Sequence, residues 1–387
     1  MIDLTTYGRP VNVREAVVGR ISKGLCNEPT LRGELILCSS EDSKAWEDLS
    51  GYRAIVTTKT LEDLPHSLPA ELPVFHTTLS ISHLQDGDVV VLQPRGLLRT
   101  LFRPESEHNA LLVTERCNSF CLMCSQPPVD RDDSGLTRVN VEAIRLMKPP
   151  PAHLGITGGE PTLLGAGLLR ILDQLKVRLP ETSVHMLTNG RRFSRPEFTA
   201  DFMAIRHRKL TLGIPLYSDN APEHDYVVQA RGAFDQTMQG LYQLARHDQP
   251  VEIRIVLHAL TIPSLRSLAR YIYRNLPFAS HVAFMGLEIT GFTKPNLQKL
   301  WVDPYDYQDE LAAAIEYLSI RGMNVSIYNH ALCVLRRPLW KFAKKTISDW
   351  KNIYLDECRS CGVLEECGGF FKSAERVHSA HIAPIPG

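Results

Sequence analysis

The stretch "TERCNSFCLMCSQPP", residues 114–128, places Cys117, Cys121 and Cys124 within eight residues. A disulfide uses two cysteines, and a structural zinc site usually uses four ligands. Three thiols in the spacing C-x3-C-x2-C therefore indicate a metal centre with one coordination position left open. Thiolates favour zinc, copper(I) or an iron–sulfur cluster, and three of them can hold three irons of a [4Fe–4S] cube.

Around this stretch, short apolar runs alternate with longer amphipathic segments. Six strands are predicted, at 110–115, 153–157, 183–188, 210–217, 251–258 and 281–289. Helices are predicted between them, at about 140–148, 165–178, 197–206, 233–247 and 264–275. This alternation predicts right-handed βαβ units and a parallel sheet. Because a closed TIM barrel needs eight units, we expect an α/β fold with a partial (β/α)6 TIM-like barrel.

Three domains are expected. Residues 1–107 form a small β-rich domain that could bind a peptide, with predicted strands within 33–40, 52–59 and 86–102. The last of these contains a break at Pro94-Arg95-Gly96 that is typical of a hairpin. Residues 108–303 form the partial barrel. Residues 304–387 form a cysteine-rich domain with a helix at about 305–320 and the strand "NVSIY".

Composition narrows the class of protein. The 387 residues contain 43 Lys plus Arg and 43 Asp plus Glu, so no bulk charge favours nucleic acid or a membrane surface. The first twenty residues contain no apolar core of signal-peptide length, and no apolar run reaches the ~20 residues of a membrane span. We therefore expect a cytoplasmic protein, where clustered cysteines more often bind metal than form disulfides.

A second motif, "GITGGEPT" at residues 155–162, closes the second predicted barrel strand. The carboxyl ends of parallel strands meet at one rim, so this motif is expected beside the cysteine loop. Gly158 and Gly159 allow close backbone approach to a ligand, and Glu160 can receive an ammonium group.

Together the two motifs resemble the radical S-adenosylmethionine (SAM) superfamily, over roughly residues 109–290. The resemblance implies an enzyme whose three cysteines hold a [4Fe–4S] cluster, with SAM on the open iron. It implies reductive cleavage of SAM to methionine and a 5′-deoxyadenosyl radical, which abstracts a hydrogen atom from the substrate. It also implies that Gly158, Gly159 and Glu160 contact the methionyl ammonium group. Further candidate cofactor contacts are Met123, Pro161, Asn189, Ser218 and Glu288.

A second cysteine set lies near residue 360. Cys358, Cys361 and Cys367 are spaced C-x2-C-x5-C, with Cys333 upstream. Four thiolates can ligate a second [4Fe–4S] cluster or a zinc ion, and the sequence leaves both open. The run resembles the auxiliary-cluster extension called SPASM, or its shorter form twitch, and implies a single auxiliary cluster. Two remaining cysteines outside both sets are expected to be core or incidental residues, Cys26 and Cys38.

Over its full length the chain resembles the C-type (HxsC) radical SAM maturases of the His-Xaa-Ser peptide-modification system. The matching segments are 114–128, 155–162, 214–225, 326–335 and 347–371. The resemblance implies a ribosomally made precursor peptide as substrate, an electron donor such as flavodoxin or ferredoxin, and a companion radical SAM maturase. Two alternatives stay open: a radical SAM enzyme acting on a small molecule in cofactor or sugar biosynthesis, and a zinc-stabilised, non-catalytic binding scaffold. The modified residue, the bond formed and the oligomeric state are not encoded in any motif found.

Overall fold

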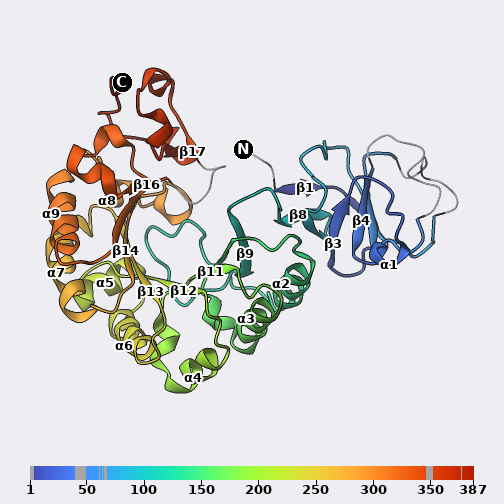
Figure 1. Cartoon of the computed structure of the whole chain (residues 1–387), viewed down its shortest axis with the longest axis horizontal. Coiled ribbons are helices and arrows are strands. Elements are labelled where there is room, and N and C mark those ends of the chain that lie inside the picture. The colour runs from blue at the N-terminus through green and yellow to red at the C-terminus, as the bar shows by residue number, and fades with distance from the viewer. Residues whose placement is uncertain are drawn as a thin grey trace. The chain divides into compact units, whose positions relative to one another are not determined.

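The computed structural model describes residues 4–39, 49–60, 62, 64, 68–345, 352–375 and 377–387 (Figure 1). The chain divides into two compact units. The first contains residues 1–113, 134–155 and 166–183, and the second contains residues 114–133, 156–165 and 184–387. No helix among the described residues combines the length and the apolar character needed to traverse a membrane.

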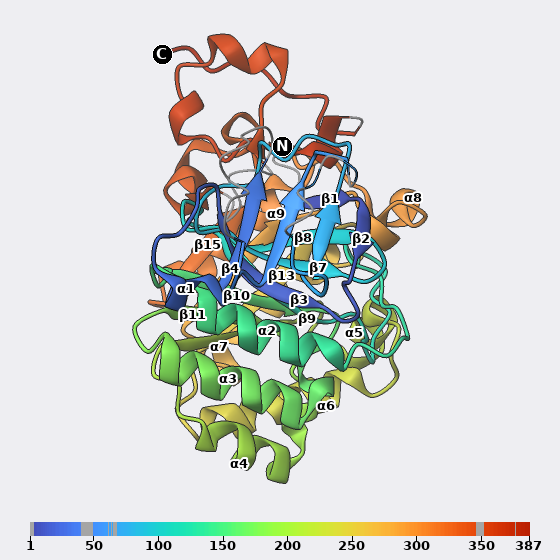
Figure 2. The same cartoon turned by 90° about the vertical axis from the view of Figure 1, so that its right-hand side faces the viewer.

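The first unit contains an eight-stranded sheet in the order β1-β8-β7-β3-β4-β5-β6-β2. Its strands are β1 Thr5–Tyr7, β2 Arg9–Val11, β3 Val17–Ser22, β4 Leu35–Ser39, β5 Ala54–Thr57, β6 Val74–His76, β7 Val89–Gln93 and β8 Leu97–Phe102. The pairs from β3 through β6 are parallel, and the other pairs are antiparallel. The first unit also holds helix α1 (Pro29–Arg32), helix α2 (Gly135–Leu146) and helix α3 (Ala166–Arg178). Helix α2 packs against α3, β3 and β7 (Figure 2).

The two ends of this strand order belong to one continuous segment. Strand β1 pairs with β8, strand β2 pairs with β6, and only Gly8 separates them. The Gly8 amide donates to the Gly96 carbonyl at 3.0 Å. A Cβ atom at Gly8 would lie 2.3 Å from the His76 carbonyl oxygen, so glycine is required for this close approach. The segment therefore links the first and last strands of the sheet.

The N-terminal strands predicted from sequence are confirmed as β4, β5, β7 and β8. The predicted hairpin turn is also confirmed, since Gly96 has a φ of +77° and donates to the Gln93 carbonyl at 3.0 Å. Strands β1, β2, β3 and β6 were not predicted; β1, β2 and β6 have only three residues each, too few to show an alternating pattern.

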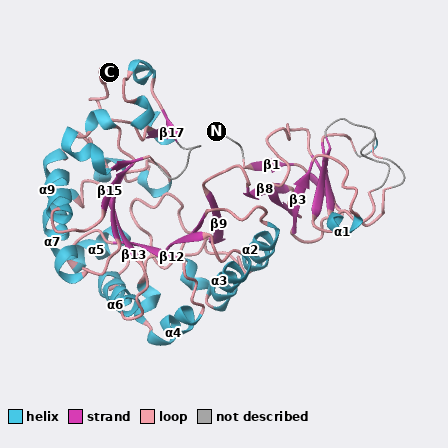
Figure 3. Ribbon diagram, viewed as in Figure 1, coloured by secondary structure: helices cyan, strands magenta, loops and turns pink. Residues whose placement is uncertain are grey.

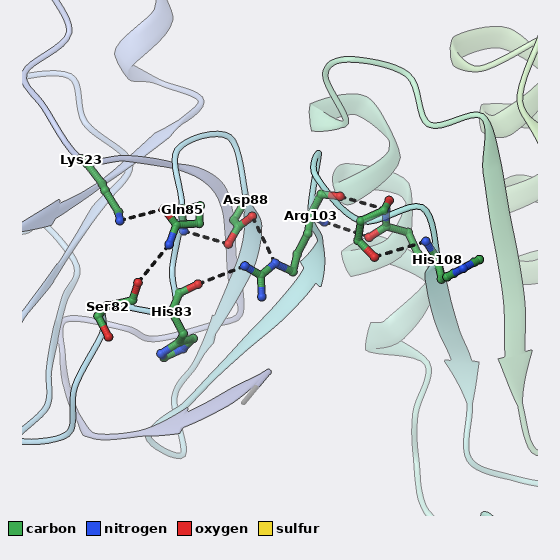
Figure 4. Close-up of polar contacts among 9 residues, drawn as sticks. Lys23, Ser82, His83, Gln85, Asp88, Arg103 and His108 are labelled. Carbon is green, nitrogen blue, oxygen red and sulfur yellow. Dashed lines mark hydrogen bonds and ion pairs between the residues drawn. The ribbon is translucent and has the colours of Figure 1, made fainter. Parts of the chain in front are cut away.

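A buried carboxylate ties the loop before β7 to the end of β8 (Figure 4). Asp88 is 1% exposed; it accepts from the Gln85 amide at 2.9 Å and faces the Arg103 guanidinium at 3.9 Å. Arg103 also donates to the His83 carbonyl at 3.3 Å. Burial raises the pKa of Asp88, although the Gln85 amide and the Arg103 charge act in the opposite direction. Beyond β8, the Asn109 side chain bonds to both the amide and the carbonyl of Arg103, at 2.9 Å each.

An ion-pair group on α2 leads to a prediction about acid stability. Glu142 accepts from Arg53 at 2.5 Å and from Arg145 at 3.0 Å. The hydrogen bond from Arg145, reinforced by Arg53, lowers the pKa of Glu142 to about 2 against the opposing effect of burial. Because this folded-state pKa lies below the ordinary value, the stabilisation is present above about pH 4.5 and is lost as the pH falls toward 2. Glu142→Gln should cost about 1 kcal/mol at pH 7, allowing for solvent screening, and much less at pH 3.

Urea unfolding at the two pH values would measure this difference. Glu71→Gln is the matched control, because the Arg14–Glu71 pair is 80% exposed on both sides and should contribute little at either pH. Equal losses for Glu142→Gln at pH 7 and pH 3 would contradict the prediction.

The second sheet has the strand order β16-β15-β14-β13-β12-β11-β10-β9. Its strands are β9 Asn109–Thr114, β10 His153–Gly158, β11 Ser183–Leu187, β12 Leu210–Pro215, β13 Val251–Leu257, β14 His281–Gly286, β15 Val325–Tyr328 and β16 Ala343–Lys344. Successive pairs from β11 to β16 are parallel. The fold class is thus confirmed as α/β with a partial TIM-like barrel. The sheet continues past the six predicted barrel strands through β15, which the sequence predicted as a separate strand, and β16.

Helices of the second unit are α4 Pro196–Ala204, α5 Ala221–Val228, α6 Ala233–Ala245, α7 Leu265–Asn275, α8 Leu297–Leu300 and α9 Gln308–Ser319. Helices α6, α7 and α9 lie on one side of β12, β13 and β15 (Figure 3). On β13, Ile253 and Ile255 are fully buried, whereas the alternate residues Glu252 and Arg254 carry charge and pair with each other. A final pair, β17 Asn352–Ile353 and β18 Phe370–Phe371, is antiparallel.

The helix predictions differ from the structure at α2, at α5 and at the four-residue helices α1 and α8, which were not predicted. Helix α2 begins at Gly135, five residues before the predicted start. Helix α5 was not predicted at all. Its start does carry an ordinary signal, because the Asn220 side chain accepts from the Glu223 amide and Pro222 lies in the first turn.

Candidate functional site

The first three cysteines follow β9 in one loop and lie close to one another. The Cys124 amide donates to the Cys121 carbonyl at 2.9 Å, which closes a turn between these two residues. Burial, together with the neighbouring Cys124 and Cys117 thiols, raises the pKa of Cys121 to about 12. The Cys117 and Cys124 thiols are therefore close enough to Cys121 to act on its charge. The donor set fits an iron–sulfur cluster held by three thiolates.

The base of the cysteine loop is fixed by a buried carboxylate. Asp133 accepts from the Thr114 hydroxyl at 2.5 Å and from the Glu115 amide at 2.8 Å. It also pairs with the Arg116 guanidinium at 3.2 Å. These contacts join the two ends of the loop next to Cys117.

The far part of the loop is held by the end of α5. The amides of Phe120 and Leu122 each donate at 3.0 Å, to the carbonyls of Val228 and Val227 respectively. The side chain of Met123, which was a candidate cofactor contact, is 7% exposed and belongs to an apolar cluster that includes Leu122.

A second segment, after β14, holds the same loop from the other side. The Phe292 amide donates to the Cys124 carbonyl at 2.8 Å, and the Thr293 hydroxyl donates to the Met123 carbonyl at 3.2 Å. Backbone contacts from two elements therefore fix the thiols in place.

The Gly-Gly-Glu-Pro motif lies against the start of the cysteine loop. The Gly159 amide donates to the Thr114 carbonyl at 2.9 Å, and the Glu160 amide donates to the Arg116 carbonyl at 2.8 Å. A Cβ atom at Gly158 would lie 2.2 Å from the Thr114 carbonyl oxygen, and one at Gly159 would lie 2.2 Å from that of Arg116. The glycines are thus required by the chain's own backbone, which they bring beside Cys117.

The carboxylate of Glu160 is completely buried and joins two strand ends. Its Oε1 atom accepts from the Thr162 amide at 3.0 Å and hydroxyl at 2.7 Å, and from the Thr188 hydroxyl at 2.7 Å. Its Oε2 atom accepts from the Asn189 amide at 2.6 Å. Pro161 begins the short 3-10 helix Pro161–Leu164 that Glu160 caps.

Removing this carboxylate should destabilise the fold. Glu160→Gln replaces one acceptor oxygen by an NH2 group that faces donors already buried, so at least one of them loses its partner. The expected cost is about 2–4 kcal/mol. Chemical denaturation of the metal-free protein would measure it, with the exposed Glu197→Gln as control. An unchanged unfolding midpoint would show that the buried hydrogen bonds contribute nothing.

Asn189 and Arg191 link the end of β11 to the cysteine loop. The Asn189 side-chain amide donates to the Asn118 side chain at 2.6 Å. Arg191 donates to the Asn118 carbonyl at 2.5 Å and to the Ser119 hydroxyl at 3.0 Å. Its charge lowers the pKa of Cys121, against the larger opposing effect of burial. Sequence reasoning missed Arg191, since an arginine after a strand is common and carries no motif of its own.

Two other candidate cofactor contacts are placed differently. Ser218 is 1% exposed, donates to Glu223 at 2.6 Å and accepts from the Asn220 amide at 3.0 Å. Its hydroxyl therefore forms hydrogen bonds with residues at the start of α5. Glu288 follows β14 and is half-buried, and its carbonyl accepts from the Thr290 amide at 3.0 Å.

The structure also brings the four later cysteines together. Burial raises the pKa of the Cys333 thiol, and the neighbouring Cys367 and Cys358 thiols raise it further. The pKa of Cys358 is raised in the same way, by burial and then by Cys367 and Cys361. Cys333 lies in the 3-10 helix Leu332–Val334, so a distant segment contributes to the set, as the sequence suggested.

Neither this set of cysteines nor the first set is arranged around a single metal ion. Within the described ranges, no group of three or more histidine, cysteine, aspartate or glutamate side chains is placed to coordinate one metal ion. Of the remaining cysteines, Cys38 is 7% exposed in the core of the N-terminal sheet, and burial raises its pKa to about 11. Cys26 is half-buried at the edge of a second apolar cluster.

Comparison with protein families gives one match: residues 111–272 fit the model described as "Radical SAM superfamily". The chain contains a radical SAM domain. This domain includes the first three cysteines, the Gly-Gly-Glu-Pro motif and Asn189, and it ends before Glu288 and the four later cysteines. Such a domain implies a [4Fe–4S] cluster and SAM as cofactors.

Three solved structures are similar to part of this chain. SuiB of Streptococcus suis is 15% identical, with a TM-score of 0.45 over 59% of this chain and 49% of that chain. The anSMEcpe structure with bound AdoMet and a Kp18Cys peptide is 16% identical, with a TM-score of 0.44 over 56% and 63%. A radical SAM methyltransferase from Sphaerobacter thermophilus is 13% identical, with a TM-score of 0.43 over 64% and 74%. This chain covers about half the length of SuiB, and no curated protein sequence matches it.

Proposed function

We propose that the chain is a radical SAM enzyme that modifies a ribosomally made peptide of the His-Xaa-Ser type. The observation that carries the radical SAM part is that Cys117, Cys121 and Cys124 lie in one loop whose start is hydrogen-bonded to the Gly-Gly-Glu-Pro backbone. The domain match covers both elements.

In this proposal the chain's own residues bind and orient the cofactors. Cys117, Cys121 and Cys124 ligate three irons, and Gly158, Gly159 and Glu160 form the rim on which the methionyl group of SAM lies. When bound, the cluster and SAM would supply reductive radical chemistry that removes a hydrogen atom from the substrate, with one electron from a flavodoxin- or ferredoxin-type donor. Arg191 and Asp133 hold the loop that presents the thiols.

The peptide substrate is supported by the resemblance of five segments to the His-Xaa-Ser maturases, and a companion maturase belongs to the same proposal. Four of these segments lie within the described residues, and the fifth, 347–371, falls partly outside them at residues 347–351.

An auxiliary [4Fe–4S] cluster completes the proposal. It is supported by the closeness of Cys333, Cys358, Cys361 and Cys367 and by their SPASM/twitch-like spacing. When bound, such a cluster could carry an electron away from the product radical.

The decisive experiment is anaerobic reconstitution followed by co-expression with a His-Xaa-Ser precursor. We expect about eight irons per chain, formation of 5′-deoxyadenosine on adding SAM and dithionite, and a mass change in the precursor. A Cys117→Ala variant should give neither nucleoside nor mass change. A colourless zinc protein would overturn the proposed function, and nucleoside formation with an unmodified precursor would overturn the peptide substrate in favour of a small molecule.

A further inference from the structure

Residues 379–387, "SAHIAPIPG", form a proline-rich segment that is anchored on the loop before α9. The Ala380 amide donates to the Asp303 carboxylate at 3.0 Å. The His381 ring stacks on the Tyr305 ring, with centroids 3.8 Å apart and an interplanar angle of 16°. These contacts hold the first residues of the segment against the loop before α9.

Two backbone amides of this segment reach cysteine sulfurs. The Ala383 amide hydrogen-bonds to the Cys333 sulfur, and the Ile385 amide donates to the Cys361 sulfur at 3.5 Å. Both residues precede a proline, which favours an extended backbone and supplies no amide of its own. In an extended chain, residues two apart point the same way, so the pattern A-P-I-P presents two donors on one side.

The segment also lies very close to the chain beside Cys361. The Gly362 amide donates to the Ile385 carbonyl at 2.8 Å. A Cβ atom at Gly362 would lie 2.3 Å from the Gly387 Cα atom, so a residue with a side chain would push the segment away. Glycine after Cys361 therefore permits the approach of the Ile385 amide.

The donors on the other sulfurs have a different origin. The Cys367 sulfur accepts from the amides of Leu332 and Gly369, at 3.5 Å each; Leu332 precedes Cys333, and Gly369 is two residues after Cys367. The proline-rich segment contributes no cysteine of its own. Its amides contact the cysteine sulfurs that would bind the cluster, but they do not bind the metal themselves. This is the arrangement expected of groups that change the properties of a metal site through its ligands.

We propose that the proline-rich segment sets the reduction potential of the auxiliary cluster through the amides of Ala383 and Ile385. This inference rests on the proposed auxiliary cluster. Hydrogen bonds to cluster sulfurs are one of the factors that set the potential, because they stabilise the more negative, one-electron-reduced state. Ala383 and Ile385 are thus positioning residues, and they contact neither SAM nor substrate in this role.

The test uses a background in which Cys117, Cys121 and Cys124 are all alanine, so that only the auxiliary cluster is present. In this background Ala383→Pro removes one donor and keeps the extended backbone, and Ala383→Ser keeps the donor. A redox titration followed by electron paramagnetic resonance should show a lower midpoint potential for Ala383→Pro, with iron still at about four per chain. We expect the reduced-to-oxidised ratio at a fixed potential to fall about tenfold, or about 59 mV for one electron.

Ile385→Pro, with Ile385→Val as its control, tests the second donor by the same redox titration. If Ala383→Pro does not bind iron, the midpoint potential of Ile385→Pro tests the inference instead. An unchanged midpoint potential in the iron-containing proline variants would overturn the inference, but it would not contradict the presence of an auxiliary cluster. A background protein without iron would instead overturn the auxiliary cluster, while nucleoside formation by the unaltered chain would still test the SAM site separately.

Discussion

Cys121→Ala is expected to abolish reductive cleavage of SAM. Cys121 lies between the other two cysteines in sequence, and both of their thiols raise its pKa. Loss of this ligand leaves two thiolates, which cannot hold three irons of a cube. Reconstituted protein should lose about four of about eight irons, and 5′-deoxyadenosine should fall to the level of a reaction without enzyme. Iron assay and liquid chromatography of the nucleoside measure the two effects.

Cys26→Ala is the matched control for this substitution, since Cys26 is a half-buried thiol in the N-terminal sheet region and belongs to neither set. It should retain all of the iron and full nucleoside formation. A Cys121→Ala variant that still cleaves SAM at the original rate would refute the ligand assignment and, with it, the proposed site.

The second large effect is expected for Cys358→Ala, which should separate SAM cleavage from product formation. The Cys358 thiol interacts with Cys367 and Cys361, and no thiol of the first set contributes to its pKa. Iron should therefore fall to about four per chain, while nucleoside formation stays within about twofold of the original. Modification of the precursor should be lost, if the auxiliary cluster accepts the electron that the product radical must give up.

Mass spectrometry of the precursor and nucleoside analysis of the same sample distinguish the outcomes. Modified precursor at the original yield would leave the auxiliary cluster with a purely structural role. The thermal unfolding midpoint should be recorded in parallel, since a variant that merely unfolds would lose SAM cleavage as well.

The barrel was predictable from sequence because its strands are short apolar runs between clear helices. Strand β13, for example, has Ile253, Ile255 and Leu257 at alternate positions, all buried. Helix α5 was missed because it is only eight residues long and has Pro222 in its first turn. The short strands β1, β2 and β6 were missed because they depend on long-range pairing more than on their own residue pattern.

The two motifs of the candidate site are recognisable in the sequence where side-chain chemistry marks them. Cysteine spacing and the Gly-Gly-Glu-Pro run identify the two motifs, although the glycines prove to accommodate the backbone of Thr114 and Arg116. The supporting contacts were not predictable, because Asp133 and Arg191 have no distinctive spacing. Backbone donors such as Ala383 are invisible in sequence, since every residue except proline has an amide.

The continuity of β1 and β2 through Gly8 has a consequence for how the N-terminal sheet could recruit an extended partner. In the strand order of the described residues, these are the two strands with a single neighbour, and each is three residues long. A partner that docked by backbone pairing would gain only a few ladder hydrogen bonds there. Discrimination between partners would then depend on surface side chains such as that of Tyr7, which is 67% exposed.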